Sequence, residues 1–209
     1  MDYALRFTRC KSYAQPAPEP DRYAALLKAA YASIKSADPS ATVISAGLSP
    51  FGAYPATSAT RTNPVKFLED LYAAGISGSF DALGTHPYNH PASPGSFHPS
   101  LAWAQLEQTT PSIRSLMVAN GDADKKIWAT EFGYPTCTTE SLCVSEAQQS
   151  AYTASAIDRW GQHPWSGPLV LYEVEDADPL DTSLNRFGVF RKDGSEKPVA
   201  AAIRSRTAP

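Results

Sequence analysis

The first residue that could do chemistry is an acid placed where a predicted strand meets a loop. Residues 127–130 (IWAT) form an apolar, β-compatible run, which is typical of a strand covered on both faces. Glu131 follows directly, and residues 132–135 (FGYP) then end the strand, because glycine and proline interrupt regular pairing. The carboxylate therefore belongs at the C-terminal end of the strand, where parallel α/β folds carry out chemistry.

Two interpretations of Glu131 compete. An arbitrary glutamate at the start of a loop is solvated, but here aromatic residues and glycine surround it, and sugar sites combine carboxylates with aromatic platforms. The segment KKIWATEFGYPT (residues 125–136) resembles the seventh strand of clan A glycoside hydrolases, the retaining (β/α)8-barrel enzymes that include cellulases, xylosidases and related β-glycosidases. The resemblance implies that Glu131 is the catalytic nucleophile and that the substrate is a carbohydrate.

The resemblance also indicates which residues bind the sugar. His86 and Tyr88, in the segment THPYNH, end the preceding predicted strand, and in the family such residues line the sugar subsite. A phenol hydrogen bond would keep Glu131 ionised and oriented; the alternative is a turn at His86 with Tyr88 packed against the barrel rim. Tyr172 resembles the position of a tryptophan beneath the sugar ring, where a tyrosine can stack with less area. The predicted substrate-binding residues are His86, Tyr88, Trp128, Tyr134 and Tyr172.

A retaining glycosidase needs a second carboxyl group, about 5–5.5 Å from the first, to protonate the leaving group. Clan A enzymes carry this acid in an Asn-Glu-Pro motif at the end of strand four. The sequence contains no Asn-Glu-Pro, and LRFTRCKSY (residues 5–13), at the corresponding place, has no carboxylate. Glu173 and Glu175 follow Tyr172, but acidic loop residues are more often simply solvated. We therefore expect impaired activity.

Strands and helices alternate along the chain. Helical periodicity with start and stop signals predicts helices at residues 21–37, 63–75, 101–119 with a break near Pro111, 145–162 and 198–205. A capping-box pattern, Ser145 with Gln148, opens the fourth of these. Apolar runs predict strands at residues 42–47, 80–88, 125–131 and 168–174. Such β-loop-α units argue for parallel strands joined by right-handed crossovers.

The predicted fold class is α/β of the TIM (β/α)8-barrel type, as a single domain over residues 1–209. A full barrel has about 250 residues and eight strands, whereas this sequence supplies four, which resemble strands five to eight of the family. Residues 1–19 would be an irregular remnant near strand four, and residues 20–209 the second half of the barrel. Half a barrel leaves open strand edges and an apolar inner face, so self-association is expected.

Three cysteines occur in the sequence. Cys137 and Cys143 bracket a short polar loop directly after the Glu131 strand. A disulfide there would pin the loop beside the site and imply an oxidising compartment; two free thiols are the alternative. Cys10 has no evident partner.

No metal or cofactor is predicted. The cysteines lack zinc-motif spacing, and the histidines lie in a proline-rich loop without a carboxylate between them. The aspartates after the last strand lack the glycine and glutamate of a calcium loop. These histidines are His86, His90 and His98, and these aspartates are Asp176, Asp178 and Asp181.

Composition excludes several classes of protein. The 209 residues are 43% hydrophobic, which suits one core, and a net charge of -3 provides no basic surface for nucleic acid. No apolar run approaches the roughly 18 residues of a membrane span, and the first residues do not begin a signal peptide. Intact members of the clan are commonly secreted, so the resemblance implies an extracellular protein.

The sequence therefore predicts a glycoside hydrolase-like protein, acting on or descended from enzymes acting on β-glycosidic bonds in poly- or oligosaccharides. The rival prediction is a non-catalytic carbohydrate-binding protein or a truncated gene product.

Overall fold

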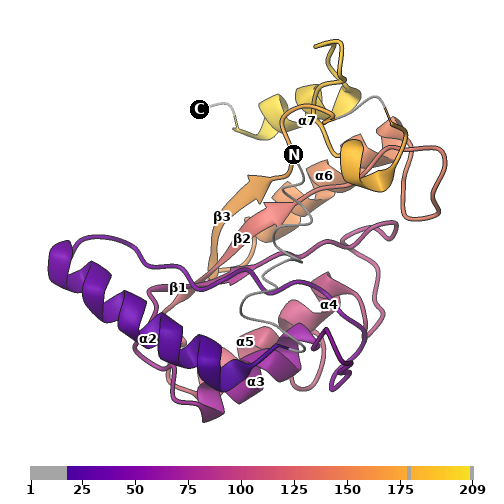
Figure 1. The fold of residues 1–209 in the computed structure, drawn as a ribbon. Coiled ribbons are helices and arrows are strands. Elements are labelled where there is room, and N and C mark those ends of the chain that lie inside the picture. The colour runs from indigo at the N-terminus through magenta and orange to yellow at the C-terminus, as the bar shows by residue number, and fades with distance from the viewer. Residues whose placement is uncertain (1–17, 178–179, 208–209) are drawn as a thin grey trace.

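The computed structural model describes residues 18–177 and 180–207 (Figure 1). Most of the predicted remnant at residues 1–19 lies outside the described residues. The elements are α2 (Pro20–Ala37), α3 (Pro64–Ala73), β1 (Ala82–Thr85), α4 (Ala102–Glu107), α5 (Ile113–Ala119), β2 (Lys126–Phe132), α6 (Glu146–Trp160), β3 (Ser166–Leu171), the 3-10 helix η1 (Ser183–Asn185) and α7 (Pro198–Thr207).

Three parallel strands form the sheet, in the order β1-β2-β3. Ile127 of β2 lies opposite Leu83 of β1 and Ser166 of β3. Helices α4 and α5 connect β1 to β2, and α6 connects β2 to β3, as parallel strands require. The predicted α/β fold with parallel strands is confirmed, and it fits part of a (β/α)8 barrel.

The strand predicted at residues 42–47 is not a continuous strand. Ile44 pairs with Ala82 and Leu48 with Thr85 in isolated parallel bridges along the edge of β1 that faces away from β2. From Ile44 to Leu48 the chain advances four residues, while from Ala82 to Thr85 β1 advances only three. The segment therefore contains one extra residue, as in a β-bulge. The Ser45 hydroxyl group accepts a hydrogen bond from the Gly84 N–H at 3.0 Å, in place of a backbone partner.

Local signals place the helix ends. The Asn63 side chain accepts hydrogen bonds from the first turn of α3, and Pro64 occupies the first helical position. Ser145 and Gln148 form the predicted capping box at the start of α6. The helix predicted over residues 101–119 is two helices, because the chain breaks around Pro111 and α5 begins with its own cap at Ser112.

The core fills the space between the sheet and its helices. Ile127 and Ala129 of β2 are buried in it with Leu83 and Phe132, and in Figure 1 α6 runs behind β2 and β3. Since side chains alternate along a strand, Trp128 points to the face opposite Ile127 and Ala129. That face would be the barrel interior, and Trp128 is only half-buried there. Within the described ranges, no helix combines the length and apolar character needed to cross a bilayer.

Candidate active site

Glu131 lies at the C-terminal end of β2, where two polar side chains hold it. The Tyr88 hydroxyl group donates a hydrogen bond to Glu131 Oε2 at 2.9 Å, and His86 Nδ1 lies 3.5 Å from the same oxygen. The Glu131 side chain is 23% exposed, so solvent and a ligand can reach it. The register of β2 with β3 shifts between Ala129 and Phe132, and this irregularity flanks Glu131.

Strand register explains why these three residues meet. Thr85, the last residue of β1, lies opposite Ala129, so His86 and Tyr88 continue the chain alongside the end of β2. Residues two apart in an extended chain point to the same side, and both side chains therefore reach Glu131. The alternative in which Tyr88 only packs against the rim does not account for its hydrogen bond.

Burial sets the protonation of the two partners. It raises the pKa of Tyr88, and the nearby Glu131 carboxylate raises it further, so the phenol stays protonated and remains a donor. Burial lowers the pKa of His86, and Glu131 only partly offsets the effect. The imidazole is therefore neutral near pH 7, with Nδ1 within 3.2 Å of Ser49 Oγ. The hydrogen bond from the neutral Tyr88 phenol and the contact with the neutral imidazole orient the carboxylate without neutralising it.

A glycine makes room for the imidazole. A Cβ atom built on Gly47 would lie 1.9 Å from His86 Nε2, well inside the contact distance. Gly47 belongs to the segment that borders β1, so this segment is one wall of the site. Any larger residue at position 47 would displace the His86 ring.

Tyr88 also packs against two other aromatic rings, and we call Tyr88, Tyr172 and Phe187 the aromatic cluster. Ring centroids lie 6.5 Å apart for Tyr88 and Tyr172, 5.6 Å for Tyr88 and Phe187, and 5.4 Å for Tyr172 and Phe187, all edge to face. Gly133 allows this approach, since a Cβ there would lie 2.0 Å from the Tyr172 carbonyl oxygen and 3.0 Å from Phe187 Cδ1. Sequence reasoning missed Phe187, whose only signal was its place in the segment RFGVF.

Two of the predicted sugar-binding aromatic residues lie elsewhere. Tyr134 is fully buried, its hydroxyl group donates to the Ala92 carbonyl group at 2.9 Å, and its ring packs against Phe132. Trp128 stands three residues before Glu131, roughly 10 Å along the strand, and its indole covers Gly167. The structure therefore does not bring Trp128 into the aromatic cluster.

The remaining histidines do not assemble a metal site. His90 packs against Tyr88 and Phe187, and burial lowers its pKa. His98 contacts the Ser100 hydroxyl group on an exposed loop. Among the described residues, no three His, Cys, Asp or Glu side chains are placed to hold a metal ion.

The two glutamates after Tyr172 differ. Glu175 is exposed and lies 3.5 Å from Lys192, as expected for a solvated loop. Glu173 is half-buried instead: burial raises its pKa, and Asp176 raises it further. Its Oε1 is buried and has no hydrogen-bond partner among the described residues, so the expectation of a solvated residue is wrong for Glu173.

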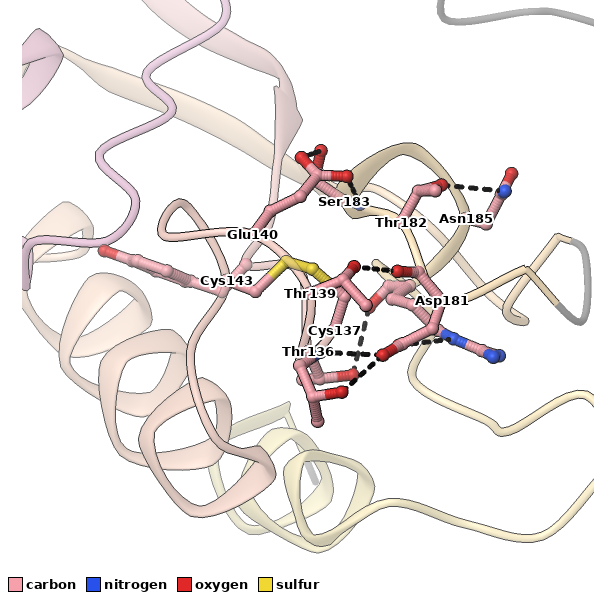
Figure 2. Close-up of a disulfide and its surroundings, with 12 residues drawn as sticks. Thr136, Cys137, Thr139, Glu140, Cys143, Asp181, Thr182, Ser183 and Asn185 are labelled. Atoms are coloured by element: carbon pink, nitrogen blue, oxygen red, sulfur yellow. Dashed lines mark hydrogen bonds and ion pairs between the residues drawn. A yellow bond between two sulfur atoms is a disulfide. The ribbon is translucent and has the colours of Figure 1, made fainter.

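Beside the site, Cys137 and Cys143 form a disulfide with a Cα–Cα distance of 5.3 Å, which decides between the two alternatives that the spacing left open. We call residues 137–143 the disulfide loop. Glu140 accepts hydrogen bonds from the backbone and hydroxyl group of Ser183 at 2.9 and 2.7 Å (Figure 2). The loop is therefore joined to the chain that leads to Phe187.

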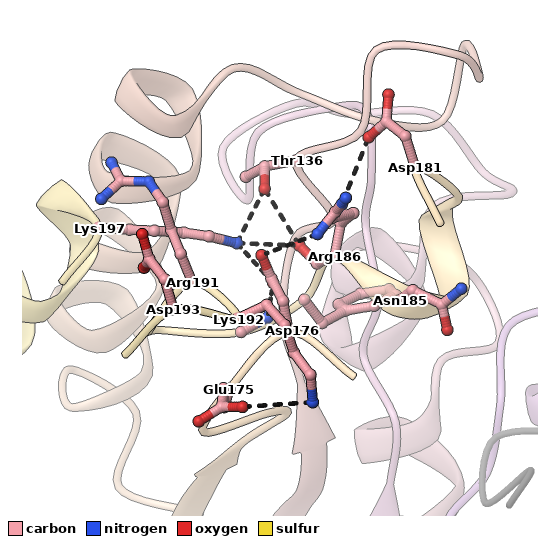
Figure 3. A network of polar contacts seen from close by, with 12 residues as sticks. Thr136, Glu175, Asp176, Asp181, Asn185, Arg186, Arg191, Lys192, Asp193 and Lys197 are labelled. Carbon is pink, nitrogen blue, oxygen red and sulfur yellow. Dashed lines mark hydrogen bonds and ion pairs between the residues drawn. The ribbon is translucent and has the colours of Figure 1, made fainter. Parts of the chain in front are cut away.

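A buried ion pair also contacts the segment that carries Phe187. Lys197 Nζ lies 2.7 Å from Asp176 Oδ1 and 2.9 Å from Thr136 Oγ1 (Figure 3). Asp176 Oδ1 also accepts from the Gly188 N–H at 2.9 Å. Both charged side chains are at most 3% exposed, so Lys197 depends on Asp176 for compensation, whereas Asp176 also lies 3.7 Å from Arg186 Nη1.

Comparison with known proteins gives the fold a context. No protein-family model and no curated protein matches the sequence. Three similar solved structures are a family 39 glycoside hydrolase from Bacteroides cellulosilyticus (26% identity, TM-score 0.66), a β-xylosidase from Caulobacter crescentus (17%, 0.59) and an endo-β-1,3-glucanase from Sorangium cellulosum (20%, 0.56).

The similarity covers most of this chain and a smaller share of each neighbour. It spans 90% of this chain and 38% of the family 39 enzyme, 91% and 38% for the xylosidase, and 90% and 62% for the glucanase. The predicted resemblance to glycoside hydrolases is confirmed at the level of structure. The chain has the fold of part of a glycoside hydrolase barrel.

Proposed function

We propose that the protein is glycoside hydrolase-like and that Glu131 is the nucleophile of a retaining reaction at β-glycosidic bonds in poly- or oligosaccharides. One observation carries the proposal: a solvent-accessible carboxylate at the end of a parallel strand is oriented by Tyr88 and His86. The aromatic cluster beside it offers apolar faces to a sugar ring. Glycoside hydrolases of known structure share the fold.

The contacts suggest which oxygen reacts. Among the described residues, Tyr88 and His86 both approach Glu131 Oε2, so Oε1 is placed to attack. A lone pair of Oε1 would form a bond to the anomeric carbon while the bond to the leaving oxygen breaks. Water would then hydrolyse the glycosyl-enzyme and release the sugar with its original anomeric configuration.

The second carboxyl group limits the substrates. The sequence has no Asn-Glu-Pro acid, so a poor leaving group would depart without protonation. We therefore expect turnover of aryl glycosides whose phenols leave as anions, and much slower turnover of alkyl glycosides and natural oligosaccharides.

Aryl glycosides test the proposal. Dinitrophenyl β-D-glucoside and β-D-xyloside are incubated with the protein and with the Glu131→Gln variant, and phenol release is followed. Release by the wild type should fall at least about 100-fold in the variant, because the nucleophile is lost. Glu175→Gln, at an exposed carboxylate that pairs with Lys192, is the matched control and should retain activity. Equal release by Glu131→Gln and the wild type refutes the assignment.

The second candidate function is carbohydrate binding without turnover. The aromatic cluster supports it, and so does the absence of an Asn-Glu-Pro acid. Affinity electrophoresis in gels containing soluble β-glucan or xylan separates the two candidates. Retardation without phenol release, lost in Tyr172→Ala, favours the binding protein.

Two further expectations belong to the same proposal. The Cys137–Cys143 disulfide supports an oxidising, extracellular location. The half-buried Trp128 on β2 and Val170, 47% exposed on β3, support self-association. Sedimentation of the wild type and Val170→Lys tests the second: equal sedimentation coefficients contradict it.

A further inference from the structure

We propose that the Cys137–Cys143 disulfide is a latch that positions Phe187 in the aromatic cluster, so that reduction of the bond loosens the sugar-binding wall. The inference rests on the proposed function for its effect on sugars, whereas the latch itself depends only on contacts within the chain. Phe187 enters as a positioned side chain that lines the site.

The disulfide loop grips the chain at two points (Figure 2). Thr138 donates to Asp181 Oδ2 from its backbone N–H at 2.9 Å and from its hydroxyl group at 2.5 Å, and the Thr139 hydroxyl group donates to the Asp181 carbonyl oxygen. Glu140 receives both the N–H and the hydroxyl group of Ser183. Three side chains of the loop thus contact two residues, Asp181 and Ser183, of the segment before Phe187.

The grip continues to Phe187 itself. The Thr136 N–H and hydroxyl group donate to the Arg186 carbonyl oxygen at 3.0 and 3.2 Å, one residue before Phe187. The Gln149 amide of α6 then donates to the carbonyl oxygens of Phe187 and Gly188 at 3.3 and 3.2 Å. Contacts on both sides of Phe187 therefore fix the backbone that carries its ring.

The covalent bond is what makes the loop a rigid anchor. The segment from Cys137 to Cys143 contains no helix or strand, so its own backbone offers little order. The two cysteines lie six positions apart, with five residues between them, and the bond limits the conformations that this short loop can adopt. Opening the bond lets Thr138 and Glu140 move independently, and hydrogen bonds at this exposed surface then compete with water.

Reduction is chemically accessible at one sulfur. Cys143 is half-buried, whereas Cys137 is 6% exposed. A dithiol would attack Cys143 Sγ as a thiolate, with Cys137 leaving as the second thiolate. The other thiol of the reductant then displaces the Cys143 thiolate, which leaves two protein thiols and an oxidised, cyclic reductant.

Hydrogen exchange followed by mass spectrometry tests the latch without any sugar. In a Cys10→Ser background, which prevents shuffling, the oxidised protein is compared with the protein reduced by dithiothreitol. Amides of residues 182–188 should exchange about tenfold faster or more after reduction, while residues 127–132 of β2 keep their protection, because only a local unit opens. Unchanged exchange at 182–188 overturns the proposal, and so does equal acceleration in β2, which indicates global unfolding.

Two variants separate the latch from the bond. Glu140→Gln keeps the disulfide but weakens the grip on Ser183, and should accelerate exchange at 182–188 partway toward the reduced protein. Glu196→Gln, which alters an exposed pair with Arg204, is the matched control and should exchange like the wild type.

Comparison of KM and kcat before and after reduction tests whether the latch affects sugar binding. With dinitrophenyl β-D-glucoside and β-D-xyloside, reduction should raise KM more than it lowers kcat, because the wall is loosened while Glu131 and Tyr88 stay in place. A fall in kcat with KM unchanged contradicts the role of the latch in sugar binding. Absence of any turnover in the oxidised protein counts against the proposed function alone, since the exchange result still decides the latch.

Discussion

The hydroxyl group of Tyr88 donates a hydrogen bond of 2.9 Å to Glu131 Oε2 across two neighbouring strand ends, although 43 residues separate them in sequence. The bond unites a buried phenol, whose pKa is raised by burial and by the carboxylate itself, with an acid that solvent can reach. The donor therefore stays protonated over the whole physiological pH range, and the acid keeps one oxygen fixed while the other remains available.

Replacing Tyr88 by Phe tests the value of this bond. A hydrogen bond to a charged group contributes roughly 1.5–3 kcal/mol, so kcat/KM with dinitrophenyl glycosides should fall about 10- to 150-fold. Tyr134→Phe is the matched control, because the Tyr134 hydroxyl group donates to a backbone carbonyl group away from Glu131. Equal losses in the two variants would show that Tyr88 acts only through general packing.

Substitution of Gly47 by Ala tests the placement of His86. The added Cβ would lie 1.9 Å from the imidazole Nε2, so the ring must leave its position and its contact with Glu131. We expect kcat/KM to fall about tenfold or more, as for loss of an orienting hydrogen bond, with the fold retained by circular dichroism. Gly78→Ala, with open space around position 78, controls for the added methyl group, although a positive φ there adds a small strain. Activity of Gly47→Ala equal to that of Gly78→Ala contradicts the role assigned to His86.

Substitution of Gly133 by Ala tests the aromatic cluster. The new Cβ would lie 2.0 Å from the Tyr172 carbonyl oxygen, which is backbone and cannot swing away. Overpacking of this kind costs roughly 1–3 kcal/mol, and it should move Tyr172 and Phe187 and raise KM. The control is Gly161→Ala, where the nearest atoms lie at 3.5 and 3.9 Å. Urea denaturation and KM for an aryl glycoside measure both effects, and a Gly133→Ala variant as stable as Gly161→Ala would disprove the close approach.

The sequence predicted the parts of the site that depend on local signals and strand order. The polar end of β1 and the carboxylate of β2 were expected to meet, because parallel strands end at the same edge, and the structure brings His86, Tyr88 and Glu131 together. The capping box of α6 was equally local. The sequence did not predict the interruption of the strand at 42–47, since this bulge depends on the hydrogen bond from the Gly84 N–H to the Ser45 hydroxyl group.

The parts that were missed depend on how loops pack. Tyr134 is three residues from Glu131, yet its ring lies in the core and its hydroxyl group donates a hydrogen bond to the Ala92 carbonyl oxygen. Phe187 arrives from a loop without periodicity, and its place depends on tertiary contacts that Gly133, Thr136 and Gln149 make with residues 186 and 187. The sequence pattern around Glu173 predicts a solvated acid, because the burial of this side chain comes from tertiary contacts that a local pattern does not encode.

Stability should depend on pH through the buried histidines. Burial lowers the pKa of His86 and of His90, so the folded state resists protons that the unfolded chain binds below about pH 6.5. The free energy of unfolding should therefore fall as the pH drops through 6.5 toward the lowered pKa values of the folded state. Urea titrations at pH 7.5 and 5.5 measure the loss. His86→Gln should reduce it and His98→Gln, at an exposed position, should leave it unchanged; a wild type equally stable at both pH values refutes the prediction.

The buried pair of Lys197 and Asp176 should be the most sensitive point of the C-terminal loop (Figure 3). Desolvation lowers the pKa of Lys197, and the hydrogen bond to Asp176 opposes that shift, so the ammonium group relies on its partner. Lys197→Met leaves Asp176 buried without its closest cation and should lower the free energy of unfolding by roughly 3–5 kcal/mol. Lys192→Met, which removes an exposed pair with Glu175, should cost no more than about 0.5 kcal/mol. Similar denaturation midpoints for the two lysine variants would show that the ion pair does not support the loop. Because Asp176 also accepts a hydrogen bond from the Gly188 N–H, next to Phe187, Lys197→Met should in addition raise KM for aryl glycosides.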